Sequence, residues 1–196
     1  MTATALLESP ATDSSAVTWA AGLVRDWTRT SSLTIGLTSG GRQSCDRRAI
    51  DALARNLDEA LSTRRVLRPM LLVRLKIMPG SSLERGAEQS ECGPPLLRSP
   101  LGAWSEVSVP VPVGKRASWS LEQLPRWLDA WRDDFGLVVI DLGPIHEVPS
   151  RVIGRLCDGC YVVLGPDNCA SRDWILQQVA WHQHSGSTIC GTLVCE

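Results

Sequence analysis

The stretch from Ile35 to Ala54, IGLTSGGRQSCDRRAIDALA, decides the fold of this chain. It begins within a short β-prone run, Leu33–Thr38, and passes through the turn Ser39-Gly40-Gly41. Apolar residues then recur at helical spacing, namely Ala49, Ile50, Leu53, Leu57, Ala60 and Leu61. A strand, a glycine turn and a helix in direct succession predict the first βα unit of a parallel sheet.

The same alternation continues along the chain. Further strands are expected at 70–77, 104–109, 137–140, 161–164 and 188–194, and further helices at 17–27, 120–131, 148–156 and 173–181. We expect the strand that begins at Trp104 to end at Pro110, since proline cannot donate to a central ladder. A capping box at Ser120 is expected to open the helix that follows. The pattern predicts an α/β fold, a mostly parallel sheet with helices on both faces.

The composition is that of one ordinary globular domain. The chain has 196 residues, of which 43% are hydrophobic, enough to bury a sizeable core. Residues 1–15 are polar and are expected to form a loose tail, and residues 16–196 to form the domain. The stretch 79–103 is rich in glycine and proline with little periodicity, which predicts an irregular excursion.

Charge and cysteine content narrow the function classes. The net charge of -1 disfavours nucleic-acid binding, and no apolar run approaches the ~18 residues of a membrane span. The start lacks a secretory pattern, so we expect a cytoplasmic protein without membrane insertion. The seven cysteines are odd in number and several lie in apolar runs, which favours reduced thiols. A zinc site is disfavoured, although a CxxC and nearby residues offer candidate ligands: Cys157, Cys160, Cys169, His146, His182 and His184.

Three segments resemble the bacterial tyrosine kinases of capsule and exopolysaccharide synthesis, relatives of the chromosome-partition and septum-site ATPases. Ile35–Ala54 is similar to their first strand, phosphate loop and first helix, and Phe135–Cys195 to their later half. Met70–Ile77 matches more weakly. The resemblance implies a phosphate-loop NTPase-like fold, with ligands at the carboxyl ends of the strands.

The same resemblance indicates a degenerate phosphate loop. A working loop needs glycines, a lysine for the phosphates and a hydroxyl for Mg²⁺. Here Cys45 stands at the last glycine, Asp46 at the lysine and Arg47 at the magnesium-binding Ser or Thr. A charge pair at ~4 Å contributes about 4 kcal/mol at an effective dielectric of ~20, and micromolar affinity totals about 8 kcal/mol. Asp46 alone is therefore expected to remove most ATP binding, unless Arg42, Arg47 or Arg48 compensates for it. The vestigial loop comprises Ser39, Gly40, Gly41, Ser44 and Asp46.

Other positions that the family uses also depart from its pattern. Its second strand carries a carboxylate, where this chain has Arg74 and Lys76. Of the family's metal-related aspartates only Asp141 has a counterpart here, and capping of the turn before Pro144 is at least as good an interpretation of it as metal binding. No independent catalytic set is found, and His146 is read as a turn residue.

These departures favour a non-catalytic relative that acts as an interaction or regulatory adaptor and needs no cofactor. The expected partner is a protein, either a membrane-bound polysaccharide co-polymerase or an active paralogue. Trp104 and Trp119 are candidate partner anchors because they flank the irregular region. The alternative is a divergent but active ATPase or tyrosine kinase that binds ATP and Mg²⁺ through a reduced anion nest. A partition-type positioning protein shares the fold and also needs nucleotide.

Overall fold

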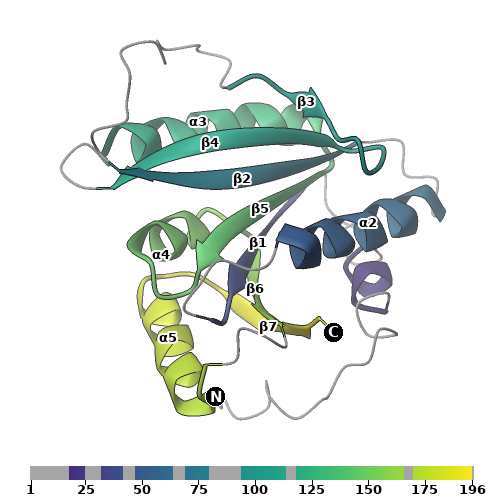
Figure 1. Ribbon diagram of the computed structural model, residues 1–196. Coiled ribbons are helices and arrows are strands. Elements are labelled where there is room, and N and C mark those ends of the chain that lie inside the picture. The colour runs from purple at the N-terminus through teal and green to yellow at the C-terminus, as the bar shows by residue number, and fades with distance from the viewer. Residues whose placement is uncertain are drawn as a thin grey trace.

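The computed structural model describes residues 18–24, 32–41, 47–63, 69–79, 94–113, 118–165 and 170–195. The elements in chain order are β1 (Leu33–Ser39), α2 (Arg47–Thr63), β2 (Met70–Pro79), β3 (Leu97–Arg98), β4 (Ser105–Val113), α3 (Ser118–Asp134), β5 (Leu137–Pro144), α4 (Val148–Gly154), β6 (Gly159–Leu164), α5 (Arg172–His184) and β7 (Ile189–Val194). Residues 18–24 form a further helical segment. The strands and helices alternate as the sequence predicts, with β3 as an addition inside the expected excursion (Figure 1).

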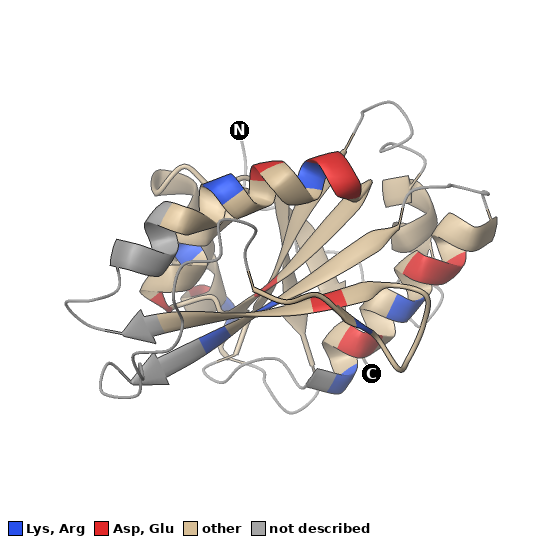
Figure 2. Cartoon of the chain, turned by 90° about the horizontal axis from the view of Figure 1, so that it is seen from above, with Lys and Arg blue, Asp and Glu red and all other residues tan. Residues whose placement is uncertain are grey.

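Within the described residues the strands form one sheet in the order β3-β4-β2-β5-β1-β6-β7. All neighbouring pairs are parallel except β3 with β4, which is antiparallel. Parallel strands need crossover connections, and the helices supply them on both faces of the sheet (Figure 2). The predicted fold class, a mostly parallel α/β sheet covered on both faces, is confirmed.

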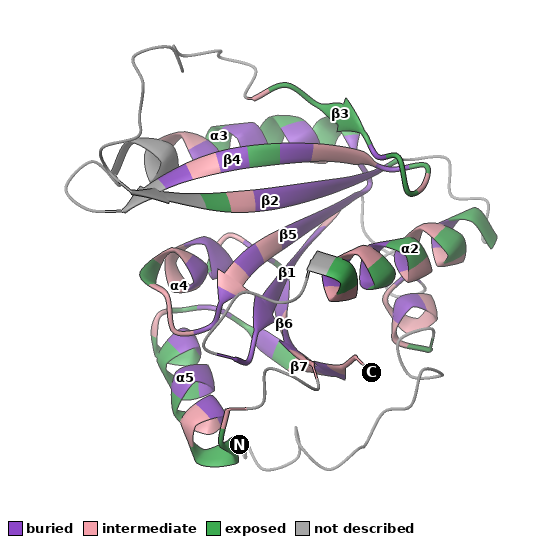
Figure 3. Ribbon diagram, in the orientation of Figure 1, coloured by how far each residue is buried: buried purple, intermediate pink, exposed green. Residues whose placement is uncertain are grey.

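Each face of the sheet has its own apolar core. One core joins α2 and residues 18–24 to one face, and the other joins α3, α4 and α5 to the opposite face. Alternate residues of β5 divide between them, with Leu137 and Val139 toward α2 and Val138 and Ile140 toward α3. This double burial explains why β5 is apolar without a break up to Asp141, and Figure 3 shows the central strands as the most buried part of the fold.

The prediction that Pro110 ends the strand after Trp104 is wrong, because β4 runs on to Val113 through Pro110 and Pro112. The antiparallel partner β3 pairs only with Glu106 and Ser105. Beyond these residues the described outer edge of β4 has no strand beside it. The two prolines are two positions apart and face the same edge, so their missing N–H groups remove no bond from the ladder with β2.

The predicted start of the third crossover helix is also displaced. The helix α3 begins at Ser118, and Ser120, the expected cap, lies inside its first turn. The helix therefore begins two residues earlier than the motif at Ser120 predicts. No helix in the described part of the chain has both the length and the apolarity needed to cross a bilayer.

Candidate functional site

The expected site lies where β1 and β5 end side by side. Ser39 is paired with Pro144 at this carboxyl edge, and the Ile145 N–H donates to the Ser39 carbonyl at 2.9 Å. The Thr38 hydroxyl donates to the Gly143 carbonyl at 2.9 Å. Ligands of open α/β sheets bind beyond such an edge, close to where strand order reverses. The end of β1, where the glycine turn begins, and the end of β5, which carries Asp141, are therefore brought together.

The glycine turn at the end of β1 is bonded and packed within the protein. The Gly40 N–H donates to the Val163 carbonyl at 2.9 Å, and the Gly41 N–H donates to the Ser39 hydroxyl at 3.2 Å. A Cβ on Gly40 would lie 2.3 Å from Cδ2 of Leu164. Close packing on β6 is thus one reason for glycine at position 40. Ser44 and Asp46 lie outside the described residues, as does the side chain of Arg47.

Asp141 stands at a bulge near the end of β5. The register with β1 passes from Leu37 opposite Asp141 to Thr38 opposite Gly143, which leaves Leu142 as the extra residue. Gly143 has a φ of 73°, a conformation that glycine adopts at little cost. Its N–H donates to Oδ1 of Asp141 at 3.2 Å. The carboxylate therefore caps this turn, as one of the two sequence interpretations expects.

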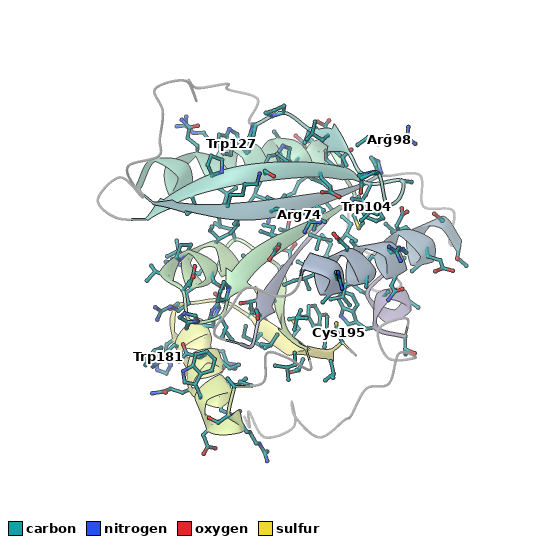
Figure 4. The ribbon with its side chains drawn as sticks, in the orientation of Figure 1. Arg74, Arg98, Trp104, Trp127, Trp181 and Cys195 are labelled. Atoms are coloured by element: carbon teal, nitrogen blue, oxygen red, sulfur yellow. The ribbon has the colours of Figure 1, made fainter. Side chains whose placement is uncertain are left out.

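A buried arginine lies beside Asp141. The Arg74 guanidinium on β2 donates from Nη2 to Oδ1 of Asp51 on α2, and from Nε to Oε2 of Glu106 on β4 at 3.3 Å. Its Nη1 lies 4.0 Å from Oδ2 of Asp141. The Arg74 side chain is only 10% exposed and is enclosed between the sheet and α2 (Figure 4). One cation is thus held among three carboxylates from three elements.

The two strand carboxylates of this cluster respond differently to their surroundings. Burial raises the pKa of Asp141; the Gly143 N–H and the Arg74 charge lower it, and the Asp51 charge raises it further, so the net shift is upward. Burial also raises the pKa of Glu106, but hydrogen bonds from Ser99, Arg74 and Trp104 together with the Arg74 charge outweigh it, and the net shift is downward. Glu106 is the firmly ionised partner of Arg74.

Asp51 and Glu106 are site residues that the sequence reasoning missed. The available signal was Arg74 itself, a charge in the middle of the apolar run MLLVRLKI. A buried charge requires ionic or hydrogen-bonding partners, so acidic residues on neighbouring elements had to exist. Which ones they are depends on β2 lying between β4 and β5, which the sequence does not specify.

The expectation that Trp104 is an exposed partner anchor is wrong. Its side chain is fully buried in the core beside α2, and its indole N–H donates to Oε1 of Glu106 at 3.2 Å. The ring lies so close to Gly102 that a Cβ there would be 2.0 Å from it. Trp104 immediately precedes β4, and its side chain lies on the same face of the sheet as Glu106. It therefore packs into the core beside α2 and does not point toward the irregular stretch 79–103. The side chain of Trp119 lies outside the described residues.

A different tryptophan is accessible. Trp181 on α5 is 45% exposed, and the Arg151 guanidinium of α4 lies 5.6 Å from the centre of its ring (Figure 4). Val148, three residues before Arg151 on α4 and 60% exposed, shares its side of the helix. We call Val148, Arg151 and Trp181 the α4–α5 patch.

The two histidines considered as zinc ligands on α5 each bond to a different backbone carbonyl. Nε2 of His182 bonds to the Ile145 carbonyl at 2.9 Å, and Nδ1 of His184 to the Ala180 carbonyl at 3.1 Å. Cys157 and Cys160 are buried together. Over the residues described, no group of three or more His, Cys, Asp or Glu side chains is placed to hold a metal ion.

Comparison with solved structures finds the same fold in bacterial tyrosine kinase domains. The BceF tyrosine kinase domain is 17% identical, with a TM-score of 0.61 over 91% of this chain and 73% of that chain. The kinase domain of the Escherichia coli tyrosine kinase ETK is 12% identical, with a TM-score of 0.61 over 88% of this chain and 70% of that chain. The cell division protein MinD of Aquifex aeolicus is 13% identical, with a TM-score of 0.53 over 83% of this chain and 68% of that chain.

These similarities show a phosphate-loop NTPase fold, in agreement with the resemblance read from the sequence. No family model matches the chain, and no curated protein sequence matches it. The identities are low enough that the similarity concerns the fold, and the function has to be argued from the site.

Proposed function

We propose that this chain is a non-catalytic member of the tyrosine-kinase-like phosphate-loop fold that works through protein contacts. The lysine and hydroxyl positions of the loop hold Asp46 and Arg47. Both changes remove groups that a nucleotide and its metal ion need. The proposed role is that of an interaction or regulatory adaptor in polysaccharide synthesis or export, without ATP or Mg²⁺.

The observation that carries this proposal is the position of Arg74 beside Asp141. A catalytic aspartate at the end of this strand would have to direct its carboxylate to a metal ion or its water. Here Oδ1 of Asp141 accepts the Gly143 N–H, and Oδ2 faces the Arg74 guanidinium at 4.0 Å. The arginine supplies, from inside the protein, the positive charge that a divalent ion would otherwise provide.

The hydrogen bonds of the glycine turn support the same proposal. An anion nest needs N–H groups that are not already bonded within the protein. The N–H groups of Gly40 and Gly41 both have internal acceptors, the Val163 carbonyl and the Ser39 hydroxyl. In the alternative, a divergent nucleotide-binding enzyme, these two N–H groups could bind phosphate only after this turn had rearranged.

The α4–α5 patch is the surface that we assign to a protein partner. Exposed tryptophan and arginine side chains are enriched at the energetic centres of protein interfaces. Trp181 already lies against Arg151, so little side-chain freedom remains to be lost when a partner binds. The partner is either a membrane-bound polysaccharide co-polymerase or an active paralogue of the same fold.

Two assays test the proposal. The purified protein should show no ATP hydrolysis and no tyrosine phosphorylation that depends on Asp141. The wild type and an Asp141→Ala variant should therefore give the same background rates. ATP hydrolysis that disappears with Asp141→Ala would refute it. In a binding assay against each partner class, Trp181→Ala should weaken binding by about 2 kcal/mol, as expected of an interface tryptophan. Trp127→Phe on the far helix α3, where Trp127 is buried, serves as the matched control.

A further inference from the structure

Two cysteine thiols meet in the core on the side of the sheet that faces α4. Cys157 follows the end of α4 and Cys160 is the second residue of β6. Cys160 is fully buried and Cys157 is 9% exposed. Interaction between the two thiols shifts the pKa of both. Both Cys157 and Cys160 are free.

Gly36 of β1 provides the space for this pair. A Cβ on Gly36 would lie 2.9 Å from Sγ of Cys160 and 3.2 Å from Sγ of Cys157. The two sulfur atoms therefore occupy one small volume against the central strand. The thiols also reach the last carbonyl groups of α4, with Cys160 donating to Gly154 at 3.5 Å and Cys157 to Ile153 at 3.8 Å.

We propose that Cys157 and Cys160 are a site of reversible oxidation that forms a disulfide beneath β1. The spacing of two intervening residues is the one that redox-active cysteine pairs use. The inference does not depend on the adaptor role. It assigns a chemical use to the pair that neither packing nor nucleotide binding requires.

The pKa values of the two thiols are shifted in opposite directions, and disulfide formation needs one thiol to ionise more readily than the other. Interaction with Cys157 lowers the pKa of Cys160 despite the opposing effect of burial. The same interaction together with burial raises the pKa of Cys157. Cys160 is therefore the thiol that more readily becomes the thiolate, the nucleophilic form, and Cys157 is the resolving partner.

A peroxide is the oxidant that the reaction requires. The Cys160 thiolate attacks one oxygen of hydrogen peroxide, the O–O bond breaks, and hydroxide leaves, which gives a sulfenic acid. The Cys157 sulfur then attacks the Cys160 sulfur, the S–O bond breaks, and the departing hydroxyl leaves as water with the Cys157 proton. In sum, two thiols and one peroxide give one disulfide and two waters.

The disulfide would act on the candidate site through α4. An S–S bond of about 2.05 Å is shorter than the approach of two unbonded sulfur atoms, so oxidation draws the end of α4 toward β6. Ser150 of α4 lies 3.1 Å from the Thr38 hydroxyl, two residues before Gly40. The oxidation state is thereby transmitted to the end of β1.

The test is peroxide treatment of the folded full-length protein, followed by unfolding in an alkylating reagent and peptide mass spectrometry. We expect Cys157 and Cys160 to escape alkylation, their peptide to be lighter by two hydrogens, and dithiothreitol to restore both thiols. The tryptic peptide also contains Cys169, so fragment spectra must locate the bond. Cys190 is the control: it is exposed and belongs to the opposite face of the sheet, so it should be alkylated in the untreated protein and form no bond to this pair.

A Cys157→Ser variant separates the two steps. It should accumulate a sulfenic acid at Cys160 that a dimedone reagent captures, whereas Cys160→Ser should leave Cys157 unoxidised. Full alkylation of both residues in peroxide-treated wild type would overturn the proposal. A disulfide that appears only when peroxide is added in denaturant would overturn it as well, and neither result depends on the variants folding.

Discussion

Nη1 of Arg74 and Oδ2 of Asp141 lie 4.0 Å apart, on strands β2 and β5 whose residues 74 and 141 are paired in register. The pairing brings an arginine to the aspartate that the kinase resemblance would assign to a metal site. Asp51 and Glu106 complete its surroundings. The contact lies at the edge of the sheet where the candidate site is expected, and its contribution to stability can be tested.

Replacement of Arg74 by Met should lower the free energy of unfolding by about 3 to 5 kcal/mol. Removing one partner of a buried ionic cluster leaves the remaining charges uncompensated, here three carboxylates between the sheet and α2. Urea titration monitored by circular dichroism measures the change.

Lys76→Met is the matched control for this experiment. Lys76 is two residues further along β2 and is exposed, so the same loss of charge should change stability by less than about 0.5 kcal/mol. Equal effects of the two replacements would show that the Arg74 cluster contributes little.

Trp104→Ala should destabilise the protein by about 3 to 5 kcal/mol, since a fully buried indole is removed. The loss includes a hydrogen bond to Glu106. Trp181→Ala, on the exposed patch, should change stability by no more than about 0.5 kcal/mol. Thermal unfolding of the two variants separates a core tryptophan from a surface one, and the reverse ranking would contradict the burial described here.

Gly40→Ala should cost about 1 to 3 kcal/mol because the added methyl group meets the Leu164 side chain. In a Leu164→Ala background the same replacement should cost less than in the wild type. A double-mutant cycle measures the difference. An undiminished penalty would point instead to a backbone requirement at position 40.

Stability should fall as the pH drops below about 6.5, because His182 is held neutral in the fold. Burial lowers the pKa of His182 from its usual 6.5, the bond to Ile145 partly opposes this, and the Arg151 charge adds to it. The unfolded chain therefore takes up the proton first. The slope is limited to about 1.4 kcal/mol per pH unit for one proton. Urea titrations across this range should show a flatter profile for His182→Gln, and an identical profile would exclude His182 as the cause.

The fold was predictable where local sequence and burial agree. The apolar run before Asp141 predicts a buried strand, and the glycine turn predicts the end of a strand. Both strands lie where the sequence places them. The extension of β4 through Pro110 and Pro112 was not predictable in the same way, because proline is tolerated only at a strand edge. Whether β4 has an unpaired edge depends on strand order, a long-range property.

The sequence predicts where the candidate site lies. It predicts less well which side chains surround it. The carboxyl ends of β1 and β5 follow from the βα pattern, and they meet as expected. The inward direction of Trp104 depends on which face of β4 its position occupies, and a one-residue difference in register reverses it. The acidic partners of Arg74 come from α2 and β4, elements distant in sequence.

The most direct test of the central claim is calorimetric titration of Mg-ATP and Mg-ADP into the wild-type protein. An Asp46→Lys, Arg47→Ser double variant, which restores the two missing loop residues, is titrated alongside it. The account predicts no binding to the wild type and recovery in the variant. Micromolar binding of either nucleotide to the wild type would contradict it, since the loop would then hold phosphate without lysine.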